Sequence, residues 1–295
     1  MRSLIKLNIL PHYRCNLNCK HCIYTIEQRE DPKVLNVMEL DALLNEVTKH
    51  FDIKYANITG GETNLLSELY FDMLFHIIKL YTNTIRLKTN FLYLNKSIIN
   101  DCSVIDVFHD FNQTNRIRDS IYKNIKAATA SDKVIHIKTY DVCCKDKINQ
   151  IIQDLNTLNV KSFEIMPHPF TKDFTGYEET ILAYLNSPIK MNFAFQNKLQ
   201  LEGILNFNNY EVKDVYITPN CKLALPDYET GQFSLQEFDN FDDFYKKFSK
   251  LEKKLEKFCE KCTSKKYCMA NYPFDTECCT NACGGCRNLL STIKH

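Results

Sequence analysis

Three cysteines fall within eight residues near the start of the chain, as Cys15, Cys19 and Cys22 in a C-x3-C-x2-C spacing. A loop this tight is not explained by disulfides. The thiols can instead turn inward around one soft metal centre, since thiolates favour iron–sulfur clusters, zinc or copper(I). Three ligands on a four-iron cluster leave one iron open, as a catalytic metal site requires. The alternative is a structural zinc site with His21 or His12 as its fourth ligand.

The cysteine loop follows an apolar run, Leu4 to Leu10, that ends at Pro11 and is typical of a strand. Further strands are predicted at residues 55–59, 84–88, 104–108, 133–139 and 162–166, with helical patterns between them. Strands that alternate with helices predict an α/β protein with a parallel sheet. In barrels built this way the active site lies at the carboxyl ends of the strands.

The second predicted strand ends in Thr59-Gly60-Gly61-Glu62-Thr63, and the whole chain has only seven glycines. Adjacent glycines let the backbone approach a ligand closely and permit a positive φ. Glu62 beside them could accept a hydrogen bond from an ammonium group. The alternative is an ordinary turn between a strand and a helix.

Together these features resemble the radical SAM enzymes, which carry C-x3-C-x-aromatic-C after the first strand of a partial (β/α)6 barrel. The resemblance implies that Cys15, Cys19 and Cys22 hold a 4Fe-4S cluster whose open iron binds S-adenosylmethionine. His21 takes the aromatic position, where the backbone of the family contacts the adenine. Gly60-Gly61-Glu62 is similar to the family's Gly-Gly-Glu-Pro motif, which binds the amino group of the cofactor, but Thr63 replaces the proline.

Other polar and thiol side chains lie at or near the carboxyl ends of the later predicted strands. Candidates for contact with the ribose or the methionine carboxylate of the cofactor are Asn90, Asp110, Asn112 and Glu164. Each could instead be a turn or cap residue. Cys143 and Cys144 follow the fifth strand, where a thiol could donate a hydrogen atom to a substrate radical. Their alternative role is as small buried hydrophobic residues.

The chain changes character in its last third, and we predict a barrel at residues 1–200 and a small α+β, cysteine-rich domain at 201–295. A helix ends on a C-x2-C-x5-C pattern that resembles the SPASM and twitch extensions of radical SAM enzymes, although no thiol follows Gly231 where a full SPASM domain has one. The resemblance implies one or two auxiliary 4Fe-4S clusters; zinc is the alternative. The predicted ligands are Cys221, Cys259, Cys262, Cys268, Cys279, Cys283 and Cys286.

The composition argues against a nucleic-acid-binding protein and against a membrane-spanning protein. The net charge of +1 gives no basic footprint for nucleic acid, and no apolar run reaches the roughly 18 residues of a membrane span. Met1 to Leu10 is too short for a signal peptide. Fourteen cysteines in a chain without such a signal favour metal binding over disulfides. We therefore expect a cytoplasmic protein of 295 residues that binds metal.

The resemblance implies an oxidoreductase or epimerase that generates a 5′-deoxyadenosyl radical and abstracts hydrogen from an unactivated C–H bond. Its substrate would be a peptide, as in maturases of ribosomal peptides, or a small natural product. Dehydrogenation, crosslinking and epimerisation are the candidate outcomes, with flavodoxin or ferredoxin as reducing partner. The alternative function is a non-catalytic zinc-binding scaffold or interaction protein, in which the Gly-Gly-Glu motif would have no role.

Overall fold

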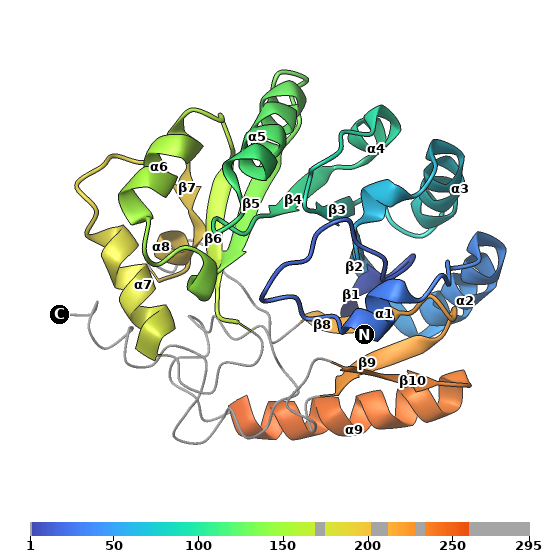
Figure 1. The fold of residues 1–295 in the computed structure, drawn as a ribbon. Coiled ribbons are helices and arrows are strands. Elements are labelled where there is room, and N and C mark those ends of the chain that lie inside the picture. Colours follow the sequence, from blue (N-terminus) through green and yellow to red (C-terminus); the bar gives the residue numbers. More distant parts are fainter. Residues whose placement is uncertain (1, 169–174, 202–211, 228–233, 260–295) are drawn as a thin grey trace.

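The computed structural model describes residues 2–168, 175–201, 212–227 and 234–259 (Figure 1). The strands are β1 (Ser3–Ile9), β2 (Phe51–Ile58), β3 (Ile85–Thr89), β4 (Val104–Phe108), β5 (Ile135–Tyr140), β6 (Ser162–Met166), β7 (Ala194–Phe195), β8 (Val212–Ile217), β9 (Leu223–Asp227) and β10 (Ser234–Phe238). The helices are α1 (Ile26–Glu30), α2 (Val37–His50), η1 (Thr63–Leu65), α3 (Glu68–Lys79), α4 (Lys96–Asp101), α5 (Asn115–Thr129), η2 (Asp141–Cys143), α6 (Ile148–Asn156), α7 (Thr175–Leu185), α8 (Gln196–Leu201) and α9 (Phe241–Cys259).

One sheet organises the described chain, with strand order β10-β9-β8-β1-β2-β3-β4-β5-β6-β7. Strands β1 to β6 are neighbours in chain order and all run parallel, as the sequence predicted. Strand β8 is parallel to the other edge of β1. Helices α2 to α6 lie on the outer face of the curved sheet (Figure 1). The prediction of an α/β fold with a partial barrel is confirmed.

Helix α3 shows how the outer layer forms. Ser67 caps the helix, because its side chain accepts the amide of the third helical residue. The apolar residues then recur at helical spacing and are all fully buried against the sheet: Phe71, Leu74, Phe75 and Ile78. Each such side chain contributes about 1.5–3 kcal/mol by leaving water.

The strands have two chemically different faces. Ile85 and Leu87 of β3 point outward into the helix–sheet core, whereas Arg86 and Lys88 between them line the interior cavity. Strand β5 repeats this alternation, with Ile137 outside and Lys138 inside. Successive side chains of a strand point to opposite faces, so the apolar core lies outside the barrel and charged groups lie within it.

The second half of the chain continues the same sheet. Strands β9 and β10 add antiparallel to β8, and α9 packs its aromatic face on β2, with Phe248 5.0 Å from Phe51 between ring centroids. The domain boundary predicted at residue 200 stays a prediction, and Cys262, Cys268, Cys279, Cys283 and Cys286 lie outside the described residues.

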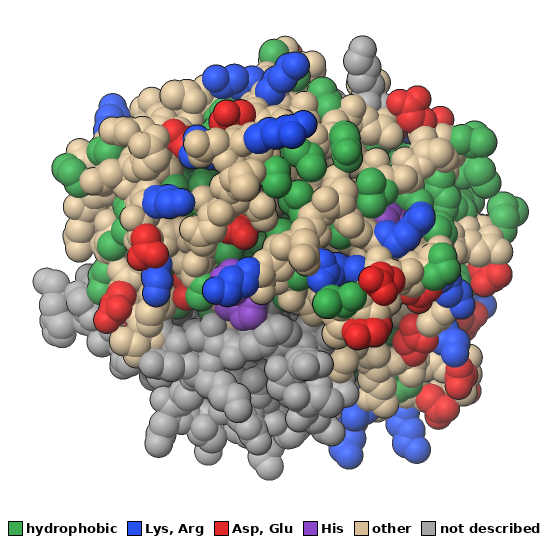
Figure 2. Space-filling view, in the orientation of Figure 1, with side chains coloured by type: hydrophobic (Ala, Val, Ile, Leu, Met, Phe, Trp, Pro, Cys, Tyr) green, Lys and Arg blue, Asp and Glu red, His purple; other side chains and the backbone are tan. Residues whose placement is uncertain are grey.

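Charges of both signs are interspersed over the visible face of the molecule (Figure 2). In the part of the chain that the structure describes, no helix combines the length and the apolar character that crossing a membrane requires.

Candidate active site

The cysteine loop is held by the loop that follows β2. The amide of Gly61 donates to the carbonyl of His12 at 3.0 Å, and the amide of Glu62 donates to the carbonyl of Arg14 at 2.8 Å. Gly60 has a φ of 124°, a positive value that glycine permits. A Cβ on Gly61 would lie 2.0 Å from the carbonyl oxygen of Arg14. The glycines therefore allow the backbone of this loop to pack closely against the backbone of the cysteine loop.

Glu62 sits beneath this junction and is 1% exposed. Its carboxylate accepts hydrogen bonds from the Asn64 amide at 3.0 Å, the Thr89 hydroxyl at 2.6 Å and the Asn90 amide at 2.6 Å. Burial raises the pKa of this carboxyl against the effect of those donors. A carboxylate has about four acceptor positions, so room remains for one further donor such as an ammonium group.

The three cysteines of the loop are partly buried and not joined in disulfides. Side-chain amides point at two of the sulfurs, from Gln113 to Cys19 at 3.4 Å and from Asn90 to Cys15 at 3.9 Å. Burial raises the pKa of Cys19 to about 12. Thiols held in this way need a metal to ionise them, and amides that donate hydrogen bonds to the ligating sulfurs are typical of iron–sulfur clusters.

Over the described residues, no three His, Cys, Asp or Glu side chains gather as closely as a single metal ion requires. A four-iron cluster binds each thiolate at a different iron, so its ligands spread over the corners of a cube. His12, one proposed zinc ligand, is buried and does not line the cavity. The described residues therefore show no arrangement for a single zinc ion at the cysteine loop.

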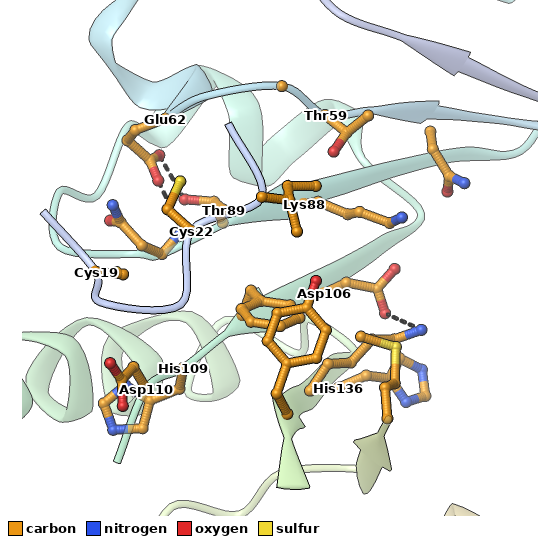
Figure 3. A pocket seen from close by; sticks show the side chains of 18 of the residues that line it. Cys19, Cys22, Thr59, Glu62, Lys88, Thr89, Asp106, His109, Asp110 and His136 are labelled. Atoms are coloured by element: carbon orange, nitrogen blue, oxygen red, sulfur yellow. Dashed lines mark hydrogen bonds and ion pairs between the residues drawn. The ribbon is translucent and has the colours of Figure 1, made fainter. Parts of the chain in front are cut away.

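A cavity of about 430 Å³ begins at these cysteines and continues into the barrel (Figure 3). At the carboxyl ends of the strands, residues from several loops line it together: His21, Gly60, Gly61, Glu62, Asn90, Asp110 and Cys143. Asn90 joins two of these loops, because its side chain donates to Asn16 at 2.7 Å while its backbone amide donates to Glu62. A single cavity thus unites the two motifs of the sequence.

Three other predicted residues, Asn112, Glu164 and Cys144, are placed differently, and of these Glu164 still lines the cavity deeper in the barrel. Asn112 does not line the cavity, and its side chain donates to the carbonyl of Val142 at 3.4 Å. Glu164 lies in the middle of the short strand β6 and pairs with Lys138 at 2.9 Å. Cys144 is 2% exposed and lies in the hydrophobic core.

Cys221 was predicted as a ligand of an auxiliary cluster. It lies on the turn after β8, with a φ of 54°, and it does not line the cavity. Its predicted partner Cys259 is the last residue of α9. The auxiliary cluster ligands therefore stay a prediction.

The interior of the barrel also holds an ion network that was not predicted from the sequence. Arg86 binds Asp106 through two hydrogen bonds of 2.8 and 3.0 Å, and Lys138 lies 3.7 Å from the same carboxylate. Burial opposes ionisation of Asp106, but Lys138 and Arg86 outweigh it and lower its pKa to about 2. The signal for this network was the alternation Ile-Arg-Leu-Lys in β3 and Ile-His-Ile-Lys in β5.

Residues 9–136 match the family model of the radical SAM superfamily. These residues form a radical SAM domain. The match contains the cysteine loop, the Gly-Gly-Glu motif and strands β2 to β4. No curated protein matches the chain in sequence.

Solved structures with the same fold include radical SAM enzymes. The chain superposes on a histidine-tagged form of anSMEcpe with bound AdoMet at a TM-score of 0.62 and 13% identity, covering 92% of this chain and 87% of that one. Native anSMEcpe with bound AdoMet and Kp18Cys peptide gives 0.61 and 13%, covering 92% and 88%. Coproporphyrinogen III oxidase HemN from Escherichia coli, a radical SAM enzyme, gives 0.50 and 11%, covering 85% and 75%. The radical SAM domain implies a 4Fe-4S cluster and S-adenosylmethionine as cofactors.

Proposed function

We propose that this protein is a radical SAM enzyme that removes a hydrogen atom from an unactivated C–H bond of a substrate held inside the barrel. One observation carries the proposal: the cysteine loop and the Gly-Gly-Glu loop pair with each other and open on one cavity that runs into the barrel. The cluster and S-adenosylmethionine, when bound, supply the electron and the organic radical for this step.

The residues of the chain have distinct roles in this proposal. Cys15, Cys19 and Cys22 hold the cluster, and Asn90 and Gln113 donate hydrogen bonds to two of their sulfurs. Glu62 orients the amino group of the cofactor through its remaining acceptor position. The surrounding barrel excludes water, which would otherwise give competing reactions.

For the substrate we propose a peptide or a small natural product, with dehydrogenation, crosslinking or epimerisation as the outcome. The peptide bound to one structural neighbour supports the first class. Cys221, Cys259, Cys262, Cys268, Cys279, Cys283 and Cys286 are proposed to hold one or two auxiliary clusters. We place the activity in the cytoplasm, where free thiols persist and flavodoxin or ferredoxin can act as reductant.

Anaerobic reconstitution with iron and sulfide tests the proposal. The holoenzyme should be brown, should carry about four irons per cluster, and should release 5′-deoxyadenosine from S-adenosylmethionine when dithionite is added. Mass spectrometry of candidate substrates then separates the outcomes, because dehydrogenation and crosslinking remove two hydrogens whereas epimerisation in heavy water adds deuterium. A colourless zinc protein that cleaves no cofactor would support the scaffold function instead.

As the hydrogen-atom donor we propose Cys143 rather than Cys144. Cys143 lines the cavity and its thiol contacts the Asp110 carboxylate. Burial raises the pKa of Cys143, so its sulfur keeps the hydrogen that a donor must give. If the enzyme is an epimerase, Cys143→Ala should still cleave the cofactor but should lose deuterium incorporation into the product from heavy water.

Cys144→Ala is the matched control, because Cys144 packs in the core and its thiol donates to the carbonyl of Asp141 at 3.5 Å. That variant should keep deuterium incorporation while losing some stability. Normal incorporation by the Cys143 variant would show that this thiol is not the donor, and would favour dehydrogenation or crosslinking.

A further inference from the structure

Mid-strand positions of the barrel interior present four cationic side chains and three carboxylates to the cavity. They are Lys6, Arg86, Lys88 and Lys138, and Asp106, Glu164 and Asp214. Glu62 and Asp110 are the remaining acidic residues of the cavity lining, and they lie on the loops beside the cysteines. One positive charge in the barrel interior is therefore in excess.

Each interior carboxylate is already engaged. Asp214 lies 3.8 Å from Lys6 and accepts a hydrogen bond from Asn8 at 2.9 Å. Asp106 is bound by Arg86 and approached by Lys138. Glu164 pairs with Lys138. The excess charge therefore belongs to Lys88, which makes no hydrogen bond or ion pair through its ammonium within the described residues.

The position of Lys88 explains why it stays unpaired. It lies opposite Asp106 in the register of β3 and β4, but Arg86 occupies both oxygens of that carboxylate. The Lys88 side chain extends toward the part of the cavity where Asp106 and His136 lie, and away from Cys19 (Figure 3). His136 adds no second positive charge, because burial lowers its pKa, and its ring bonds to Ser162.

An unpaired cation inside a protein is unusual, because buried charges are normally matched by an opposite charge. Burial, followed by the nearby charge of Lys138, lowers the pKa of Lys88 to about 8. At pH 7 the side chain is still mostly protonated. The cavity thus presents one cation that lacks a counter-ion, beside the place where a substrate would lie.

We propose that the Lys88 ammonium binds a carboxylate group of the substrate in the barrel interior. This inference rests on the proposed function and narrows its substrate to acids, such as an acidic peptide side chain, a peptide C-terminus or a carboxylated small molecule. A carboxylate balances the single excess charge of Lys88. A phosphate dianion would add a second negative charge close to Asp106 and Asp214, which repel it.

Trace acetylation of the anaerobic holoenzyme tests this site, with mass spectrometry reporting the rate at each lysine. Propionate is the probe, and propionamide is the neutral control of the same size. The exposed Lys123 of α5 is the internal reference. A bound carboxylate raises the pKa of an ammonium by about one unit or more, so propionate should slow acetylation of Lys88 about tenfold relative to Lys123. Propionamide and S-adenosylmethionine alone should leave the rate at Lys88 unchanged.

Three results would overturn the proposal. The first is that Lys88 is acetylated at the same rate with propionate as with propionamide. The second is that S-adenosylmethionine alone protects Lys88 from acetylation. The third is that Lys88 is never acetylated, because its ammonium is not accessible from the cavity. Propionate should raise the melting temperature of the wild-type protein and should not raise that of Lys88→Met. The Lys88→Met variant should still cleave the cofactor in the absence of substrate. A wild-type protein that cleaves no cofactor would contradict the proposed function. The acetylation rates do not depend on cofactor cleavage, so the two failures can be distinguished.

Discussion

Replacing Cys19 with alanine should abolish cleavage of S-adenosylmethionine. Cys19 lies in the middle of the loop that opens on the cavity, and Gln113 donates to its sulfur at 3.4 Å. Loss of a partner around a metal ligand typically costs about 10–100-fold in activity, so loss of the ligand itself should cost more than about 100-fold. The measurement is 5′-deoxyadenosine released per hour under dithionite, together with a loss of about four irons per chain.

Cys102→Ala is the control for this variant. Cys102 is 4% exposed, lies in the hydrophobic core before β4, and so sits at the end of the strands away from the cysteine loop. Its replacement should cost about 1 kcal/mol of stability through a small cavity, with cofactor cleavage unchanged. A Cys19→Ala protein that still releases 5′-deoxyadenosine at the wild-type rate would refute the assignment of the cluster loop.

The order of strands and helices was predictable because local patterns carry it. Each of the first six strands is a short run with β-branched residues, and the amphipathic spacing between strands fixes the helices. Parallel pairing follows, since strands joined by helices return in the same direction. The start of β2 was misplaced by four residues: the strand begins at Phe51, directly after the last residue of α2. That boundary depends on packing of Phe51 against α9, which is nearly 200 residues away in the sequence.

The loops that line the cavity could be predicted from the sequence, but the orientation of their side chains could not. The cysteine loop and the Gly-Gly-Glu loop were assigned from spacing, and the structure places them together. The orientation of Cys143 and Cys144 could not be predicted, because the η2 turn directs one thiol to the cavity and the other to the core. Glu164 was placed at or near the carboxyl end of its strand, but its pairing with Lys138 inside the barrel could not be predicted.

The charged residues of the interior can be read from the sequence, but their meeting inside the barrel follows only from the curvature of the sheet. Alternating apolar and charged residues in a strand usually indicate one face toward water. Here helices cover the apolar face and the curved sheet encloses the other, so Arg86, Asp106 and Lys138 meet across three strands. Because the sheet encloses these side chains, they form an interior ion network in which Lys88 has no partner among the described residues.

Gly61→Ala should disrupt the site through the backbone alone. The new Cβ would lie 2.0 Å from the carbonyl oxygen of Arg14 and 2.3 Å from that of Tyr13. Neither atom belongs to a side chain that can turn away, so the cysteine loop must move from the loop after β2. We expect a loss of about 1–3 kcal/mol in the free energy of unfolding, with lower cluster content after reconstitution. Urea unfolding and iron analysis measure the two effects.

Gly176→Ala provides the matched control, because a Cβ at Gly176 meets no atom within 4 Å. Gly176 is exposed and helical, in the first turn of α7. Alanine there should be neutral or should stabilise the protein by up to about 1 kcal/mol, because alanine has the higher helix propensity. Both variants add the same methyl group, so a difference between them reports the contact with the cysteine loop. Equal stability and equal iron content in the two proteins would mean that the loop tolerates the shift and does not depend on this backbone junction.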